Sequence, residues 1–263
     1  MNLATTLIRR HPLLPVVGTL GLAILACAKP TAPETPDVPS FSYEPTQSDA
    51  GKGISLALLK PQLPDSYAEA ARNSYQGYEF LTGNKIRVWA SEPAITRATR
   101  EAVGRSLVEY FTASGFTVSG PFESAEEMTF PEKKQADLLL SVEFGIAFQV
   151  PPLVWTGDSP TGPMPYSEGP CMVVGSISFV LWEPLSMQRM WAKSVEVKEA
   201  QTADCTVKVK SAEQWKTLME NRVAPLHEEA FEHVMNAAER YFNPEEVALV
   251  KKQAEEVREK KVY

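Results

Sequence analysis

The sequence has few of the residues that most often carry enzyme chemistry. It holds three histidines and three cysteines in 263 residues. His227 and His233 fall on one expected helix, and their spacing of six residues puts them on different faces, where they cannot share a zinc ion. The sequence also lacks the motifs that expose a catalytic serine, cradle a phosphate or bind a dinucleotide. We therefore predict a protein that is not an enzyme and that uses no cofactor and no metal.

Acidic side chains are the remaining candidates for catalysis, and most of them fall on the outer faces of expected helices. Glu143 differs because it lies within the longest expected strand, residues 136–150. We favour an exposed position on the face of that strand, since carboxylates are rarely buried. The alternative is an acid or base of a hydrolase whose other residues the sequence does not reveal.

Basic residues are too few to offset the acidic ones, and the formal net charge is −7. Residues 1–26 contain Arg9 and Arg10 but no acidic residue, so the chain without them has a charge near −9. A surface of this sign repels phosphate backbones, and no basic stripe offsets it. The charge therefore argues against nucleic acid as a partner.

The N-terminal hydrophobic run is shorter than the roughly 20 residues that a transmembrane helix needs. It extends over fourteen residues, 13–26, and follows two arginines, as the core of an export signal does. It ends in Ile24-Leu25-Ala26-Cys27, which resembles a lipobox. The resemblance implies a signal peptide over residues 1–26 and acylation of Cys27, palmitate included. The alternatives are an ordinary cleaved signal and an uncleaved anchor with an incidental cysteine.

The predicted anchor places the domain outside the cytoplasm. Three acyl chains, at roughly 0.8 kcal/mol per buried CH₂, would make membrane attachment effectively permanent. Ala28 rather than an aspartate follows the cysteine, and by resemblance to sorted lipoproteins this favours the outer membrane. Residues 27–50 hold five prolines among threonines and serines, the composition of a semi-rigid tether.

Cys171 and Cys205 remain for the exported domain, and two cysteines in an oxidising compartment usually pair. Cys171 opens an apolar run, and the chain turns at residues 183–186 and returns toward Cys205. Both cysteines then lie at the open end of one hairpin. We predict a disulfide between them; two free buried thiols are the alternative.

Alternating strand and helix signals predict an α/β (α+β) fold on a mixed, largely antiparallel sheet. Strands are expected at residues 53–60, 85–90, 116–119, 136–150, 171–183 and 189–199. Helices are expected at residues 95–113 and 211–242, with a short one that a Ser124–Glu127 capping box opens and Pro131 interrupts. The single domain is predicted over residues 51–243, and a charged C-terminal helix over residues 244–263.

Residues 151–170 are expected to form a loop that contains six prolines together with Trp155 and Tyr166. Large aromatic residues on a loop of a rigid scaffold often bind a partner. Two interpretations of Trp155 and Tyr166 stay open. They either cover the sheet edge or core, or they are contact residues for a protein or glycan partner.

Five stretches follow one another over most of residues 50–261: Ile54–Pro61, Ala113–Val118, Phe130–Leu138, Trp182–Ser186 and Pro244–Lys261. In this order they resemble the neuraminyllactose-binding haemagglutinin (adhesin A) family of outer-membrane lipoproteins. The resemblance implies an α/β domain that serves as a surface adhesin or flagellar-sheath protein. It does not extend to sialyl-lactose binding, because the family's lysine-rich motif corresponds here to Pro151–Pro165, which has no Lys or Arg.

A broader resemblance rests on the strand at Gly115–Val118, the strand that starts at Ala136–Leu140, and the hairpin after it. The same order is similar to small periplasmic assembly lipoproteins, such as those of curli secretion. We therefore predict an outer-membrane-anchored, non-catalytic binding domain, a surface adhesin or interaction protein. The alternative is a periplasm-facing envelope-assembly or adaptor lipoprotein.

Overall fold

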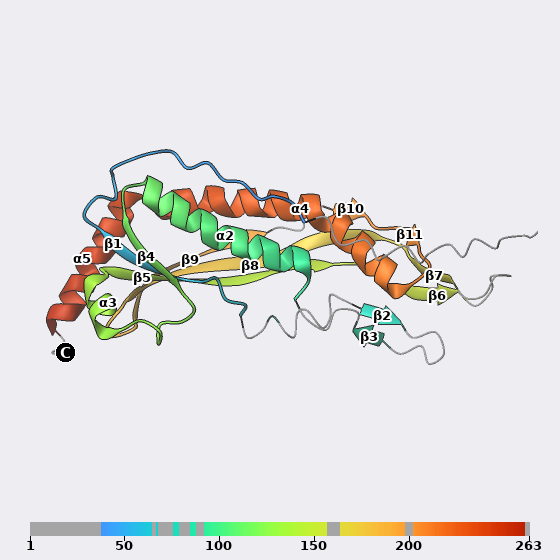
Figure 1. Cartoon of the computed structure of the whole chain (residues 1–263), viewed down its shortest axis with the longest axis horizontal. Helices are drawn as coiled ribbons and strands as arrows, with labels where there is room; N and C mark the ends of the chain where they lie inside the picture. The colour runs from blue at the N-terminus through green and yellow to red at the C-terminus, as the bar shows by residue number, and fades with distance from the viewer. Residues whose placement is uncertain are drawn as a thin grey trace, which may run out of the picture. The chain divides into compact units, whose positions relative to one another are not determined.

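The computed structural model describes residues 38–64, 67, 76–78, 85–87, 92–156, 164–197 and 202–260. They belong to one unit, residues 33–263. At its centre is a mixed six-stranded sheet in the order β10–β8–β5–β1–β4, with β9 also paired to β8 (Figure 1). Helices pack against this sheet, so the predicted α/β fold with a mixed sheet is confirmed.

The main sheet is parallel at one end and antiparallel at the other. Its strands are β1 (Ser55–Leu59), β4 (Thr117–Phe122), β5 (Leu138–Gln149), β8 (Pro170–Glu183), β9 (Gln188–Val197) and β10 (Thr202–Asp204). β1 is parallel to both of its neighbours, β4 and β5, whereas the β5–β8 and β8–β9 pairs are antiparallel. Helical crossovers connect the parallel strands and a tight turn connects β8 to β9, as these two kinds of pairing require.

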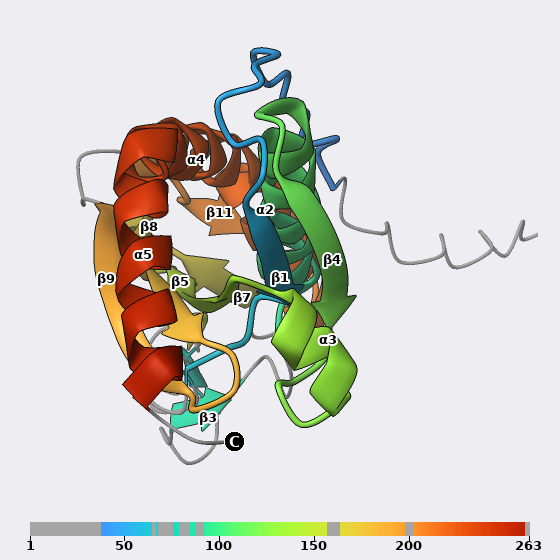
Figure 2. The same ribbon diagram turned by 90° about the vertical axis from the view of Figure 1, so that its left-hand side faces the viewer.

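Two helices, α2 (Ala94–Ala113) and α4 (Ala212–Tyr241), cover one face of the sheet (Figure 2). Alternate residues of β1 and β5 point toward them and are buried: Leu56, Leu58, Leu138, Leu140, Val142, Phe144, Ile146 and Phe148. The opposite face carries the short helix α3 (Phe130–Gln135), next to a small cluster that includes Ala57 and Leu139. Gly115, with a φ of +86°, follows the end of α2 in the left-handed conformation that favours glycine.

The long helix expected at residues 211–242 is present as α4 and buries one apolar stripe. Val223, Leu226, Phe231, Val234 and Ala238 of α4 are all buried. The last helix, α5 (Pro244–Lys260), begins as expected, because Asn243 Oδ1 accepts a hydrogen bond from Glu245 N at 3.0 Å. The buried residues of α5, Val247, Val250 and Ala254, pack on the rest of the domain across β8 and β9.

The start of the short helix differs from the prediction. The capping box is formed by Thr129 and Glu132 rather than by Ser124 and Glu127. Glu132 N donates to Thr129 Oγ1 at 3.4 Å, and Thr129 N donates to Glu132 Oε2 at 2.7 Å. Pro131 therefore does not interrupt a helix but lies in the first turn of α3, where its missing N–H removes no helical hydrogen bond.

The expected loop at residues 151–170 is wrong in part, because it contains strands β6 (Val154–Thr156) and β7 (Met164–Ser167). With β11 (Val207–Lys208) they form a second sheet in the order β11–β7–β6. A third, two-stranded sheet pairs β2 (Gln76–Tyr78) with β3 (Lys85–Arg87), which is the start of the strand expected at residues 85–90. Residues 88–90 and 157–163 lie outside the described residues.

Residues 38–47, which we call the strap, cross the helical layer without regular secondary structure (Figure 1, blue trace). The Phe41 ring packs against the Phe231 ring of α4, with 5.3 Å between their centroids, and Tyr43 Oη donates to a carboxylate oxygen of Glu239. The sequence assigned these residues to the tether. The structure instead packs the strap on the domain, because its two aromatic side chains bury apolar surface there.

Candidate functional site

The predicted lipidation site, Cys27, lies outside the described residues, and so does the signal peptide before it. Within the part of the chain that the structure describes, no helix combines the length and the apolar character needed to cross a bilayer.

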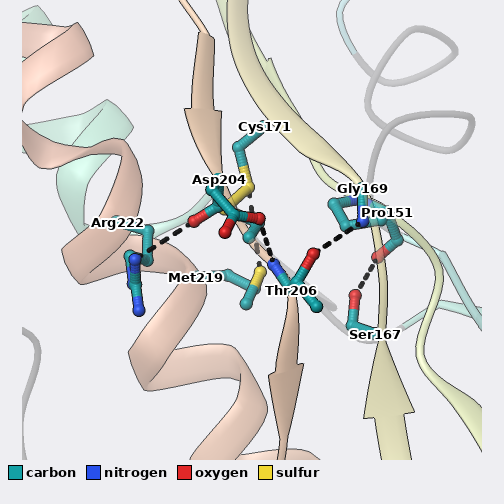
Figure 3. Close-up of a disulfide and its surroundings, with 9 residues drawn as sticks. Pro151, Ser167, Gly169, Cys171, Asp204, Thr206, Met219 and Arg222 are labelled. Atoms are coloured by element: carbon teal, nitrogen blue, oxygen red, sulfur yellow. Dashed lines mark hydrogen bonds between the residues drawn. A yellow bond between two sulfur atoms is a disulfide. The ribbon is translucent and has the colours of Figure 1, made fainter.

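The structure joins Cys171 and Cys205 in a disulfide with 5.7 Å between their Cα atoms (Figure 3). Cys171 lies near the start of β8 and pairs in register with Ala203 of β10, and Cys205 N donates to Gly169 O at 3.0 Å. Both cysteines are fully buried, and Met219 of α4 lies against Cys171. The disulfide therefore ties the open end of the hairpin to the chain that leads into α4.

Polar contacts beside the disulfide hold the same loop. Thr206 N donates to Asp204 Oδ1 at 2.9 Å, and hydrogen bonds from Thr206 hold the pKa of Asp204 below its ordinary value. Arg222 donates to the Asp204 carbonyl at 3.2 Å, and Gly169 N donates to Thr206 Oγ1 at 3.3 Å (Figure 3). These polar groups stabilise the conformation of the loop beside the disulfide.

Removing the disulfide is expected to lower the free energy of unfolding by about 2–4 kcal/mol, because it closes a loop with a sequence separation of 34. The comparison is between the wild type and the double variant Cys171→Ser/Cys205→Ser in urea unfolding, each with and without reductant. Reductant should lower the free energy of unfolding of the wild type and leave that of the double variant unchanged. Two reactive thiols in unfolded, unreduced wild-type domain, counted apart from Cys27, would contradict the disulfide.

The structure does not gather Trp155 and Tyr166 on one surface. Trp155 pairs in register with Pro165 and Tyr166 with Val154, so the two aromatic residues lie on opposite faces of the small sheet. Both are half-buried. Trp155 shares its face with the buried Pro165, which agrees with a covering role. Tyr166 pairs in register with the exposed Lys208 on the other face.

The two histidines lie in different surroundings on α4. His233 is exposed, whereas His227 is fully buried. His227 Nδ1 lies 2.9 Å from Thr99 Oγ1, whose own proton is donated to Ile95 O at 2.8 Å. Nδ1 therefore carries the proton. Burial lowers the pKa of His227 to about 3, so the ring is neutral at ordinary pH.

Glu143 is exposed on β5, as the favoured interpretation expects. Among the described residues no group of three or more His, Cys, Asp or Glu side chains is placed to hold a metal ion. The structure does not bring Glu143 together with either histidine of α4.

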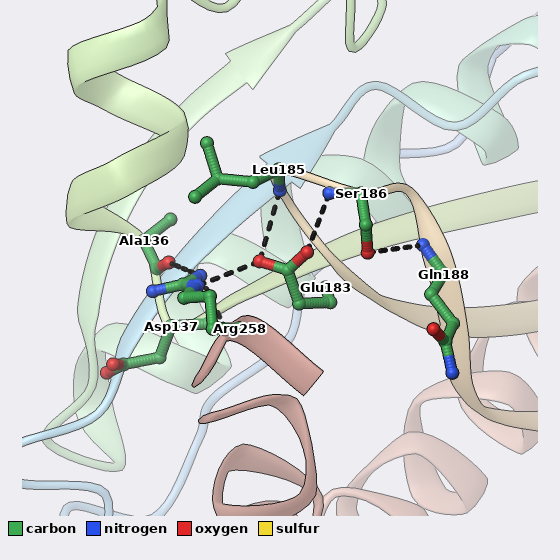
Figure 4. A network of polar contacts seen from close by, with 7 residues as sticks. All are labelled: Ala136, Asp137, Glu183, Leu185, Ser186, Gln188 and Arg258. Carbon is green, nitrogen blue, oxygen red and sulfur yellow. Dashed lines mark hydrogen bonds and ion pairs between the residues drawn. The ribbon is translucent and has the colours of Figure 1, made fainter. Parts of the chain in front are cut away.

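A buried ion pair that the sequence did not reveal joins three elements (Figure 4). Glu183, at the end of β8, is 0% exposed. Its carboxylate accepts from Ser186 N at 2.6 Å and from Arg258 Nε at 2.8 Å. Burial raises the pKa of Glu183, but the hydrogen bonds from Ser186 and Arg258 outweigh it and leave the pKa below its ordinary value. Arg258 Nη2 also donates to Ala136 O at 2.7 Å, which links α5 to the end of α3.

A hollow on the described surface lies along α2, and we call it the α2 groove. Its first part, of about 660 Å³, lies where the parallel strands β1 and β4 end, and includes Pro61, Gly104, Val108 and Pro121. Its second part, of about 610 Å³, lies between the end of α2 and strap residues that include Tyr43 and Pro45. Val108 and Glu109 line both parts, so the two parts adjoin each other.

Local packing explains the shape of the α2 groove. Pro61 follows β1 and lies so close to α2 that a Cβ atom on Gly104 would be 2.9 Å from its ring. Arg100 is held by Glu92 through two hydrogen bonds of 3.0 and 2.9 Å and donates to Pro61 O at 3.0 Å. Lys60 pairs with Glu123 at the rim. The groove thus has apolar residues on its floor and charged side chains around them.

The α2 groove is suited to an elongated ligand. Its lining runs along α2 from Arg100 to Ala113, a distance of about 20 Å at 1.5 Å per residue. An extended chain of roughly six residues has that length. Sequence reasoning missed this site because it is built from segments far apart in the chain, and none of them carries a motif.

Comparison with known proteins supports the fold alone. No family model matches the sequence, and no curated protein matches it. A solved structure of a Xanthomonas campestris protein of family DUF330 covers 75% of this chain and 96% of its own at 12% identity, with a TM-score of 0.28, too low to indicate a shared fold. A neuraminyllactose-binding hemagglutinin homolog from Helicobacter pylori covers 81% of this chain and 99% of its own, at 15% identity and a TM-score of 0.52. This chain therefore shares its fold with that homolog along almost the whole of the homolog's length.

Proposed function

We propose that this protein is an outer-membrane lipoprotein whose domain binds a protein or a glycan without catalysis, as a surface adhesin or interaction protein. The observation that carries the proposal is the fold shared with the hemagglutinin homolog, which spans 99% of that chain. The order of segments that resembles the adhesin A family supports a distant membership of this chain in the same family.

The use of the buried polar groups also favours binding over catalysis. Glu183 is held by Arg258 and by backbone N–H groups of the hairpin turn, and His227 is held in the core by Thr99. These side chains stabilise the fold and do not line the α2 groove. The groove combines apolar residues such as Pro61 and Val108 with charged residues such as Arg100 and Glu109, so it offers both apolar and charged contacts to a ligand.

The membrane anchor is tested at Cys27. Cells grown with radiolabelled palmitate should label the wild type and the Cys171→Ser variant, and the Cys27→Ser variant should carry no label and leave the membrane fraction. The reason is that only the cysteine of the lipobox is acylated. Label that persists in Cys27→Ser, or a wild type without label, would contradict the lipoprotein assignment.

The side of the membrane is tested by protease treatment of intact cells followed by immunoblotting of the domain. If the domain is a surface adhesin, protease treatment of intact cells should remove its band from the immunoblot while periplasmic control proteins stay intact. A band that disappears only after the outer membrane is permeabilised would contradict the adhesin role and favour the periplasm-facing assembly role.

A further inference from the structure

We propose that the strap is an exchangeable ligand, and that its seat on α4 and α2 accepts an extended segment of a partner protein with aromatic residues at alternate positions. The proposal rests on the binding role given above, because it names a polypeptide as the partner. It does not depend on the lipid anchor.

The strap contacts the domain in the way that an extended peptide contacts a receptor. Alternate residues are half-buried, namely Pro39, Phe41, Tyr43 and Pro45, and the residues between them are exposed. Phe41 packs on the Phe231 ring and Tyr43 donates to the Glu239 carboxylate. In an extended chain successive side chains point in opposite directions, so every second residue reaches the same surface.

Between the strap and the other described residues there is no backbone–backbone hydrogen bond. Among the described residues, the first backbone hydrogen bonds that tie the N-terminal segment to the domain are Ser48 N to Ala113 O and Gly51 N to Ser114 O, both 2.8 Å. The contacts that hold residues 38–47 on the described part of the domain are made by side chains, Phe41 and Tyr43 among them. Segments with few buried contacts open at low free-energy cost without unfolding of the rest, and Ser48 is the point at which such opening ends.

The seat of the strap persists when the strap leaves. Phe231 and Glu239 belong to α4, which is fixed on the sheet by its buried stripe. Tyr110 of α2 holds the end of α4, because its hydroxyl lies 3.2 Å from Phe242 O. The apolar surface that Phe41 covers and the carboxylate that Tyr43 reaches are thus preformed.

The seat continues into the α2 groove, since Tyr43 and Pro45 form one wall of its second part opposite Val108 and Thr112. A partner segment that replaces the strap would take the place of this wall and would contact Val108 and Thr112 of α2 directly. Such an elongated surface fits an extended polypeptide better than a compact ligand.

The test uses the full chain in detergent and a fluorescent peptide with the sequence of residues 37–47. Fluorescence anisotropy should show binding to the Phe41→Ala/Tyr43→Ala variant that is at least tenfold tighter than binding to the wild type, because the wild-type strap competes in cis. The matched control variant, Ser40→Ala/Ser42→Ala, changes exposed residues and should behave as the wild type. A peptide with both aromatic residues replaced by alanine should not bind.

Circular dichroism establishes that the double variant is folded; if it is not, Phe41→Ala alone is used with the same expectations. A folded variant that does not bind the peptide overturns the proposal, and so does equal binding of the alanine peptide. The proposal is also overturned if the wild type is a dimer and the peptide dissociates it, because the seat would then be occupied by a second copy of this chain. Glycan binding by intact protein without any peptide binding would overturn this inference and leave the proposed function standing.

Discussion

Replacing Arg258 with alanine is expected to lower the free energy of unfolding by about 3–5 kcal/mol. Glu183 is 0% exposed, and Arg258 is the cation that pairs with it at 2.8 Å. Without the guanidinium, the buried carboxylate keeps donors in the hairpin turn, Leu185 N and Ser186 N among them, but loses the cation that balances its charge, and a buried charge without its counter-ion is costly. The Ala136 carbonyl loses its 2.7 Å donor as well, which loosens the contact between α5 and the end of α3.

Urea unfolding at pH 7 measures this loss, with Lys60→Ala as the matched control. Lys60 pairs with Glu123 on the surface, where the two side chains are 47% and 58% exposed, so its removal should cost about 0–1 kcal/mol. A second change, Glu183→Gln in the Arg258→Ala background, should recover part of the loss because it removes the buried charge. Equal stabilities of Arg258→Ala and Lys60→Ala would show that the buried pair does not stabilise the fold.

The periodicity of apolar residues in the sequence was enough to predict the long helix α4 and the long strand β5. The stripe of α4 and the alternating residues of β5 are dictated by helix and strand geometry, which repeat locally. The disulfide was predicted from the expected export and from the hairpin, because only Cys171 and Cys205 remained after the predicted lipidation site. Such predictions depend on neighbours in sequence and on simple counting.

The short helix shows where local reasoning became ambiguous. Both Ser124–Glu127 and Thr129–Glu132 match the spacing of a capping box. The first choice puts Pro131 inside the helix, where the ring clashes with the preceding turn, and the second puts it in the first turn, where it is tolerated. Giving the position of Pro131 greater weight would have selected the correct box.

The candidate site could not be predicted because its parts meet only in the folded chain. The lining of the α2 groove combines Pro61 with Gly104 and Pro121, and Tyr43 with Thr112. The packing of the strap on the domain was not predicted, because a composition rich in proline and serine is typical of a tether. Two aromatic side chains, Phe41 and Tyr43, are sufficient to pack it on the helical layer.

His227 is expected to make the domain less stable as the pH falls below about 6.5. The ring is fully buried on α4, with Thr99 of α2 on its protonated nitrogen and Phe148 of β5 at its edge. Burial lowers its pKa from the ordinary 6.5 to about 3. Between these two values the unfolded chain binds a proton that the folded chain does not, so acid favours unfolding. The stability contributed by neutral His227 is complete above pH 6.5 and is lost as the pH falls toward 3.

The expected slope is about 1.4 kcal/mol per pH unit, or roughly 2 kcal/mol between pH 6.5 and pH 5. Urea unfolding measured over this interval separates His227 from the carboxylates, most of which titrate at lower pH. His227→Gln keeps a polar side chain beside Thr99 but does not titrate, so its stability should be nearly independent of pH there. His233→Gln, at an exposed position of the same helix, should keep the wild-type slope. If His227→Gln and His233→Gln lose stability equally between pH 6.5 and pH 5, a group other than His227 causes the acid sensitivity.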